Sequence, residues 1–266
     1  MKGDYSLALW DARERRLYLI VAPMAQRIVY WHARPKGFWF ATTLSALHQF
    51  PSVPKTLDPL QLALQFTVTV ADPADTLYKN IRLVPPGTYL TADGRGVREQ
   101  AFWRLDTRRR VTLPTPQAYA DAARDLLDQA VQRSLRSAQT PGFLLSGGLD
   151  SSAVVATAAR LLAPAPLSTY TVEPPPGQEV AGRKGWYDRE RPYVDAVTAR
   201  YSNIRPHFCN ATEPASIELD PTPFFVAGGR NQFNANHLGW FDAAYRAVQK
   251  KWAYCAANGP IRQFNP

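Results

Sequence analysis

The sequence has few cysteines and histidines, and it contains no long apolar run. Cys209 and Cys255 are the only cysteines among its 266 residues, and its four histidines show no metal-ligand spacing. This pattern excludes a disulfide framework and a motif-type metal site. No run of about 18 apolar residues occurs, which excludes a membrane-spanning helix. The start, Met1-Lys2-Gly3-Asp4, lacks the apolar segment of a secretory signal. These absences predict a cytoplasmic protein without a membrane partner.

Positive charge is in excess but spread along the chain. The formal net charge is +9, and the arginines gather only at Arg13–Arg16 and Arg108–Arg110. We expect the first run in a hairpin turn and the second in a linker, neither of which is a nucleic-acid-binding module. The charge therefore indicates a solvated surface or a field that attracts ATP and acidic substrates, with no nucleic-acid partner.

The most informative segment is Phe143-Leu144-Leu145-Ser146-Gly147-Gly148-Leu149-Asp150-Ser151-Ser152. It joins an apolar strand to a glycine loop and then to a predicted helix, Ala153–Leu162. Backbone N–H groups at such a junction converge on one point, where the helix dipole favours an anion. Ser146, Ser151 and Ser152 add hydroxyl donors and are candidate N-caps. The segment predicts a binding site for the pyrophosphate of a nucleotide.

Asp150 fits an anion site if a divalent cation lies between its carboxylate and a phosphate. The loop therefore fits the pyrophosphate of a nucleotide together with a divalent metal ion, for which Asp150 is the candidate ligand. The loop is not a Walker A motif, because no Lys-Ser or Lys-Thr pair follows Gly148, and it is not a GxGxxG motif.

The first part of the chain is predicted to be mainly β-structure, from alternating apolar residues between turn signals. We expect two hairpins, two short helices and a final strand before a polar, proline-rich linker over 106–116. The hairpin strands are Tyr5–Trp10 with Arg16–Val21 and Ile28–Trp31 with Gly37–Thr42; the helices are Thr43–Phe50 and Asp58–Phe66; the later strands are Thr88–Leu90, after a turn, and Ala101–Trp103.

From Pro116 onward, helical and apolar strand patterns alternate. Helices are predicted at Tyr119–Leu135, at Tyr193–Tyr201 and at Leu238–Lys250, and a second strand at Leu167–Val172. This order favours a doubly wound parallel sheet. Ligands of such sheets bind at the carboxyl ends of the strands, where Ser146–Gly148 and the residues after Val172 emerge.

Four segments in this order resemble the glutamine-hydrolysing asparagine synthetases. They are Gly3–Asp11, Phe40–Leu47, Leu83–Leu90 and the loop Ser146–Ser152, which is also similar to the pyrophosphate loop of ATP pyrophosphatases in general. Leu149 and Ser152 resemble the asparagine synthetase branch in particular. The second segment lacks the Glu and Lys that the family has there.

The resemblance implies an α/β protein: a partial antiparallel α+β glutaminase-like domain followed by a partial doubly wound parallel-sheet ATP-pyrophosphatase domain. We expect the first over residues 1–105, the linker over 106–116 and the second over 117–250. It further implies ATP and Mg²⁺ as cofactors, with Asp150 as the ligand of the Mg²⁺. By the same resemblance, ATP and pyrophosphate are held by Leu145, Ser146, Gly147, Gly148, Leu149, Asp150, Ser151, Ser152 and Val172, with Leu145 and Val172 near the adenosine.

Both ends of the chain depart from the family pattern. The glutaminase nucleophile is an N-terminal cysteine, and neither Cys209 nor Cys255 fits that position. We therefore expect no glutaminase catalytic residue here and poor stability of residues 1–105 alone. The tail over 251–266 has no strand pattern. One choice of codons for Gly259–Pro266, read one base later, encodes Gly-Gln-Ser-Gly-Asn-Ser-Thr, a loop type of the family. We hypothesise a frameshift.

The function implied by the family is amide formation: ATP adenylylates an aspartate-like carboxylate, and ammonia then displaces AMP. We expect this activity to be impaired in a truncated chain. The alternatives are a lasso-peptide or β-lactam-type ring-forming amide synthetase and a non-catalytic remnant. The expected partners are a small carboxylate substrate and ATP, together with a second copy in a homodimer or a protein that supplies ammonia.

Overall fold

The computed structural model describes residues 3–24, 27–67, 69, 72–136, 141–174, 190–210 and 242–250. Within these ranges the chain is a mixed α/β protein that combines antiparallel sheets with a parallel sheet. It divides into two compact units at Val111 and Thr112. The predicted tail over 251–266, the first residues of the predicted helix from Leu238, and Cys255 lie outside the described residues.

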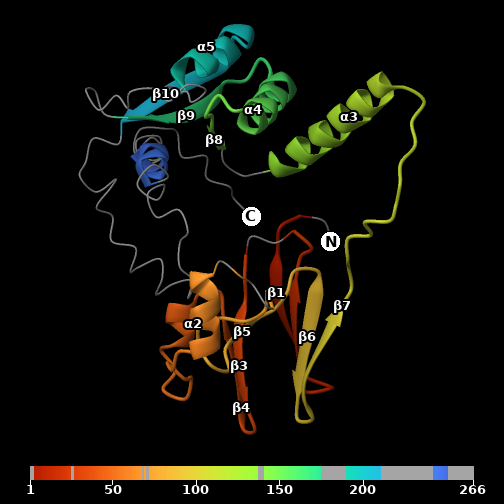
Figure 1. Ribbon diagram of the computed structural model, residues 1–266, viewed down its shortest axis with the longest axis vertical. Coiled ribbons are helices and arrows are strands. Elements are labelled where there is room, and N and C mark those ends of the chain that lie inside the picture. Colours follow the sequence, from red (N-terminus) through yellow and green to blue (C-terminus); the bar gives the residue numbers. More distant parts are fainter. Residues whose placement is uncertain are drawn as a thin grey trace, which may run out of the picture. The chain divides into compact units, whose positions relative to one another are not determined.

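The first unit contains a four-stranded antiparallel sheet (Figure 1). Its order is β1-β2-β6-β7, with β1 at Ser6–Asp11, β2 at Arg16–Val21, β6 at Thr88–Asp93 and β7 at Gly96–Ala101. Apolar residues alternate along β2 and β6, so that Leu19, Val21 and Leu90 are buried on one face. Leu9 and Trp10, successive residues of β1, are both more than half exposed.

A second antiparallel sheet lies in the same unit, in the order β4-β3-β5. The strands are β3 at Tyr30–Arg34, β4 at Gly37–Ala41 and β5 at Arg82–Leu83, accompanied by helices α1 at Leu44–Leu47 and α2 at Pro59–Phe66. As predicted, α2 begins after Asp58, whose Oδ1 accepts a hydrogen bond from the Leu60 N–H at 2.9 Å. Tyr30, Leu44, Leu47 and Ile81 form the core of this part.

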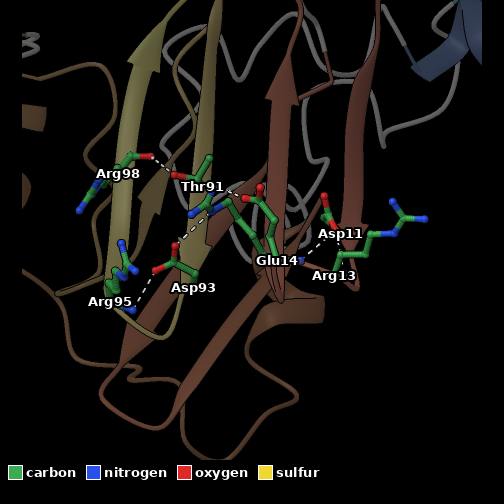
Figure 2. A network of polar contacts seen from close by, with 8 residues as sticks. Asp11, Arg13, Glu14, Thr91, Asp93, Arg95 and Arg98 are labelled. Carbon is green, nitrogen blue, oxygen red and sulfur yellow. Dashed lines mark hydrogen bonds and ion pairs between the residues drawn. The ribbon is translucent and has the colours of Figure 1, made fainter.

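Side-chain carboxylates fix the two hairpin turns of the four-stranded sheet (Figure 2). Asp11 accepts hydrogen bonds from the N–H groups of Arg13 and Glu14, and Asp93 accepts one from the N–H of Arg95. The Nε of Arg16 reaches Asp93 at 3.1 Å and so links the two turns. The Arg95 N–H and the Arg16 guanidinium lower the pKa of Asp93. The contacts are those of structural turns, which agrees with an Arg13–Arg16 run in a hairpin.

The second unit contains a parallel sheet in the order β10-β9-β8 (Figure 1). The strands are β8 at Gly142–Leu144, β9 at Leu167–Glu173 and β10 at Ile204–Asn210; the helices are α3 at Pro116–Ser134, α4 at Leu149–Leu162 and α5 at Arg191–Arg200, with a further helical segment at 242–250. No described helix is long and apolar enough to cross a membrane.

Helices pack on both faces of this sheet. Phe143 lies against the core cluster that contains Val155 of α4 and Val194 of α5. Its neighbour Gly142 faces the other way, and a Cβ built there would lie 3.5 Å from Cγ2 of Val248. The helical segment at 242–250 therefore covers the face opposite α4 and α5.

Several predicted boundaries are wrong. Of the predicted strand Ala101–Trp103, only Ala101 is in a strand, as the last residue of β7. The N–H groups of Phe102 and Trp103, which follow it, both donate to the carbonyl of Gly87. The turn between β3 and β4 has two residues, which is shorter than predicted because β3 extends to Arg34. His32 therefore lies inside β3, where it is buried and its Nδ1 is 2.7 Å from the Asn80 carbonyl oxygen.

One further strand and the starts of helices α3 and α4 also differ from the predictions. The strand β10 was not predicted. Pro116 is the first residue of α3 rather than the last of the linker, with Thr115 as its N-cap. The helix after the glycine loop begins at Leu149, four residues before the predicted Ala153. Leu149–Ser152 thus form its first turn rather than loop.

Candidate functional site

The glycine loop is anchored where β8 ends beside β9. The Leu145 N–H donates to the Tyr170 carbonyl at 3.0 Å, and the Leu145 carbonyl accepts from Oγ1 of Thr171 at 2.6 Å. The Leu145 side chain is buried in the core. Because both polar backbone groups of Leu145 are used, the chain leaves the sheet at a fixed position and the loop begins at Ser146.

Gly147 has a backbone conformation that favours glycine, with φ of +71°. The first turn of α5 lies directly against it. A Cβ built on Gly147 would lie 2.5 Å from Cβ of Tyr193, 3.2 Å from the Glu190 carbonyl oxygen and 3.4 Å from the Val194 nitrogen. The absence of a side chain at this position therefore lets α5 form one wall of the loop.

Ser146 and Ser151 close the loop on itself. The Ser151 Oγ lies 3.2 Å from the Ser146 N–H, 3.0 Å from the Ser146 Oγ and 3.1 Å from the Gly148 carbonyl. The predicted N-cap role of the serines is wrong: Gly148 is the N-cap of α4, with no side-chain hydrogen bond at the cap. Ser151 acts instead from the first turn backward onto the loop, which fixes the spacing between strand and helix.

The first turn of α4 presents unused backbone donors. The first intrahelical bond runs from the Ser152 N–H to the Gly148 carbonyl at 3.0 Å. The N–H groups of Leu149, Asp150 and Ser151 have no acceptor among the residues that the structure describes, as expected at a helix N-terminus. The Leu149 side chain is 90% exposed, so the turn faces open space. Donors of this kind, aligned with the helix dipole, suit an anion.

Two side chains of the turn are available to a ligand. Asp150 is exposed and makes no ion pair within the described part of the chain. The Ser152 Oγ is buried and has no hydrogen-bond partner among the described residues. No group of three or more potential metal-ligating side chains occurs in the described ranges. A single carboxylate combined with phosphate oxygens is nevertheless a usual arrangement for Mg²⁺, so Asp150 fits a metal held jointly with a polyphosphate.

Val172 lies on the strand next to the loop. It is the residue before the end of β9 and pairs with Cys209 of β10. Since β8 and β9 are parallel, Leu145 and Val172 lie at neighbouring carboxyl ends of the sheet. The structure thus brings all nine predicted site residues to one edge of the parallel sheet.

Sequence reasoning missed an ion pair at this edge. Two of the guanidinium nitrogens of Arg191, Nε and Nη2, donate to the carboxylate of Glu173, at 2.8 Å and 2.5 Å. Arg191 opens α5, and Glu173 closes β9. The only available signal was the position of Glu173 immediately after an apolar strand.

Burial raises the pKa of two titratable groups near this edge of the sheet. Glu190, beside Gly147, has a pKa raised to about 7 because its carboxyl is partly removed from water. Cys209, buried in β10, has a pKa raised by the same cause. A thiol of raised pKa is a poor nucleophile, so the structure gives Cys209 no catalytic setting.

Comparison with known proteins identifies two family matches along the chain. Residues 1–103 match the glutamine amidotransferase domain, and residues 122–213 match the asparagine synthase family. The second match contains β8, the loop, α4, β9 and α5.

The curated relatives that the chain matches are named as glutamine-hydrolysing asparagine synthetases. The chain is 25% identical over 180 residues to asparagine synthetase (glutamine-hydrolyzing) 3 of Bacillus subtilis (strain 168), covering 65% of this chain and 28% of the relative. It is 24% identical over 184 residues to asparagine synthetase (glutamine-hydrolyzing) 2 of the same organism, covering 64% and 24%. A probable asparagine synthetase (glutamine-hydrolyzing) of Acanthamoeba polyphaga mimivirus is 51% identical over 47 residues, 18% of this chain and 8% of that protein. The chain spans about a quarter of the length of the two Bacillus relatives. Both matched parts of the chain are therefore similar to the glutamine-hydrolysing asparagine synthetases.

Proposed function

We propose that this chain is an amide ligase of the asparagine synthetase type, which binds Mg-ATP at Leu145–Ser152 and adenylylates a small carboxylate such as that of aspartate. The observation that carries the proposal is the set of unused N–H groups at Leu149, Asp150 and Ser151, next to a glycine loop at the carboxyl edge of a parallel sheet. Such donors match the oxygens of a pyrophosphate.

In the proposed reaction, a carboxylate oxygen attacks the α-phosphorus of ATP and the bond to the β-phosphate oxygen breaks. Negative charge then grows on the departing pyrophosphate. Donors fixed in advance at that position stabilise the transition state more than the ground state. The first turn of α4 supplies these donors. Ammonia then attacks the acyl carbon and releases AMP, which leaves the amide.

Mg²⁺ bound through Asp150 would neutralise charge on the pyrophosphate oxygens. The protein's own part is to orient the carboxylate of Asp150 from the first helical turn, where it is exposed beside the free N–H groups. Val172 and Leu145, at the ends of neighbouring strands, are assigned to the adenosine side of the same edge.

The domain assignment follows from the same proposal. We assign residues 1–105 to part of a glutaminase-like domain, 106–116 to a linker and 117–250 to part of a doubly wound ATP-pyrophosphatase domain. The division at Val111 and the two family matches support this assignment, as do the helices on both faces of the parallel sheet.

Isotope exchange between ATP and pyrophosphate tests the activity, because it requires adenylylation but not ammonia. We expect exchange with Mg²⁺ and aspartate, and its loss on chelation of the metal. Exchange supported by a peptide carboxylate instead of aspartate would assign the chain to the ring-forming amide synthetases.

Binding of Mg-ATP to variants tests the site itself. Asp150→Asn is expected to weaken binding about tenfold or more, since it removes a charged ligand. Asp125→Asn is the matched control, because Asp125 is an exposed carboxylate on α3. A folded wild-type chain that binds neither Mg-ATP nor Mg-pyrophosphate would overturn the proposal, and equal binding by the two variants would overturn the role of Asp150.

A further inference from the structure

The ion pair between Glu173 and Arg191 closes the connection between β9 and α5. Glu173 is the last residue of β9, and Arg191 is the first residue of α5, 18 positions later. The two parallel hydrogen bonds hold the carboxylate and the guanidinium in one plane, the strongest geometry for such a pair. The Glu173 side chain is 19% exposed and the Arg191 side chain 47% exposed, so the pair lies at the surface and its contribution depends on its two-point geometry rather than on burial.

Arg191 also contacts a third element of the site. Its guanidinium carbon lies 3.6 Å from the ring centroid of Phe208 in β10. An arginine can bind a carboxylate with its edge while its flat face lies on an aromatic ring, which lysine cannot do in the same way. Arg191 therefore ties the start of α5 to two neighbouring strands, β9 and β10.

The position of the first turn of α5 depends on these contacts of Arg191. Its N-cap, Glu190, makes no side-chain capping hydrogen bond, so local capping does not fix where the helix starts. The same turn forms the wall against Gly147, through the Glu190 carbonyl, Tyr193 and Val194. Any displacement of the turn would open space beside the glycine loop.

We propose that Arg191 is a positioning residue, which through Glu173 and Phe208 holds the first turn of α5 against Gly147 and so keeps the pyrophosphate loop in its binding conformation. The inference rests on the proposed function, since it assigns the clamp a role in pyrophosphate binding. Glu173 takes the Nε–H and one N–H of Nη2, so this carboxylate sets the orientation of the guanidinium, which favours a positioning role. Fixing such support in advance lowers the cost of ordering the loop when the ligand binds.

The experiment compares Arg191→Met and Arg191→Lys with a matched control, Arg124→Met. Arg124 is an exposed arginine on α3, paired with Asp121. Two quantities are measured on the full chain: hydrogen exchange of the loop amides without ligand, and the affinity for Mg-pyrophosphate by calorimetry. We expect Arg191→Met to speed exchange at Gly147–Ser151 and to weaken binding about tenfold. The control should change affinity less than about twofold.

Partial rescue distinguishes positioning from general stability. Arg191→Lys keeps the positive charge but not the two parallel N–H donors of the guanidinium. We therefore expect its loop exchange rate and its affinity for Mg-pyrophosphate to fall between those of wild type and Arg191→Met. Glu173→Gln should match Arg191→Met, and the double variant should be no worse than either single one. Unchanged loop exchange in Arg191→Met, or faster exchange spread evenly over the second unit, would overturn the inference. If the wild type binds no Mg-pyrophosphate, the proposed function fails, and the role of the clamp in binding fails with it.

Discussion

Tyr193 occupies the space that a side chain at position 147 would need. A Cβ built on Gly147 would lie 2.5 Å from Cβ of Tyr193, a separation that real Cβ atoms do not show. The two residues belong to different elements, the loop after β8 and the first turn of α5. Because of this contact, the conformation of the glycine loop and the position of the first turn of α5 depend on each other.

Gly147→Ala is therefore expected to destabilise the second unit by about 2–3 kcal/mol, through strain at positive φ and the clash with Tyr193. Gly148→Ala is the matched control. Gly148 has φ of −68°, and a Cβ there would lie 3.4 Å from Oγ of Ser146. Its cost should stay at or below about 1 kcal/mol. Urea unfolding of both variants checks the difference, and equal costs would contradict it.

Glu190→Gln should remove a pH dependence of stability. Burial raises the pKa of Glu190 from 4.5 to about 7 in the folded chain. Between these values the unfolded chain has released the proton and the folded chain still holds it, so folding stability falls as pH rises through this window. The variant should lose this slope, whereas Glu99→Gln, at an exposed site in β7, should keep it. Unfolding free energies at about pH 5 and about pH 8 measure the effect.

Asn203→Ala should destabilise the second unit. The Asn203 side-chain amide donates to the carbonyl of Ala159 at 2.9 Å and to that of Ala165 at 3.0 Å, and so ties the end of α4 to the approach to β9. Loss of both bonds leaves the carbonyl of buried Ala159, and that of Ala165, without this donor, at an expected cost of about 1–3 kcal/mol. Ser202→Ala, at the exposed neighbouring position, should cost no more than about 0.5 kcal/mol. Thermal unfolding of the two variants compares them.

Thr76→Val tests the first unit. The buried Thr76 hydroxyl donates to the Ile81 carbonyl at 2.8 Å and accepts from the Tyr78 N–H at 3.1 Å, which shapes the turn before β5. Valine keeps the volume but removes both bonds, so we expect a loss of about 1–3 kcal/mol. Thr76→Ser retains the hydroxyl and should lose less. A larger loss for serine than for valine would show that packing outweighs hydrogen bonding at this position.

The strongest sequence patterns predicted their elements well. Arg16–Val21 is β2 as predicted, because apolar residues at every second position have one buried face to fill. Asp58-Pro59 marks the start of α2 because a side-chain acceptor and a fixed φ both suit a helix N-terminus. The glycine loop was located correctly because the strand before it and the helix after it are both apolar.

The elements that were missed lack such a pattern. β7 is Gly-Val-Arg-Glu-Gln-Ala and almost wholly exposed, so pairing with β6 rather than burial makes it a strand. β10 contains Arg205, Pro206 and His207, and it pairs with β9 at one end of the sheet order. Proline is tolerated at such a position but argues against a strand when only the sequence is read.

Contacts between distant residues were beyond sequence reasoning in the candidate site as well. Leu149–Ser152 read equally well as loop or as helix, and only the bond from Ser152 to Gly148 decides between them. The pairing of Glu173 with Arg191 joins residues 18 positions apart, which no local sequence pattern indicates. Residue types at the site were thus predictable, whereas the side chains that support them were not.

The order of these elements along the chain has a consequence for synthesis on the ribosome. The glycine loop emerges first, and the α5 residues that wall it, Tyr193 and Val194, are made only after β9. Domains fold as units once their parts are available. A nascent chain that ends before α5 would therefore carry the complete Ser146–Ser152 segment but not the wall beside Gly147. The proposed nucleotide binding should accordingly begin only when α5 has been released from the ribosome and has docked.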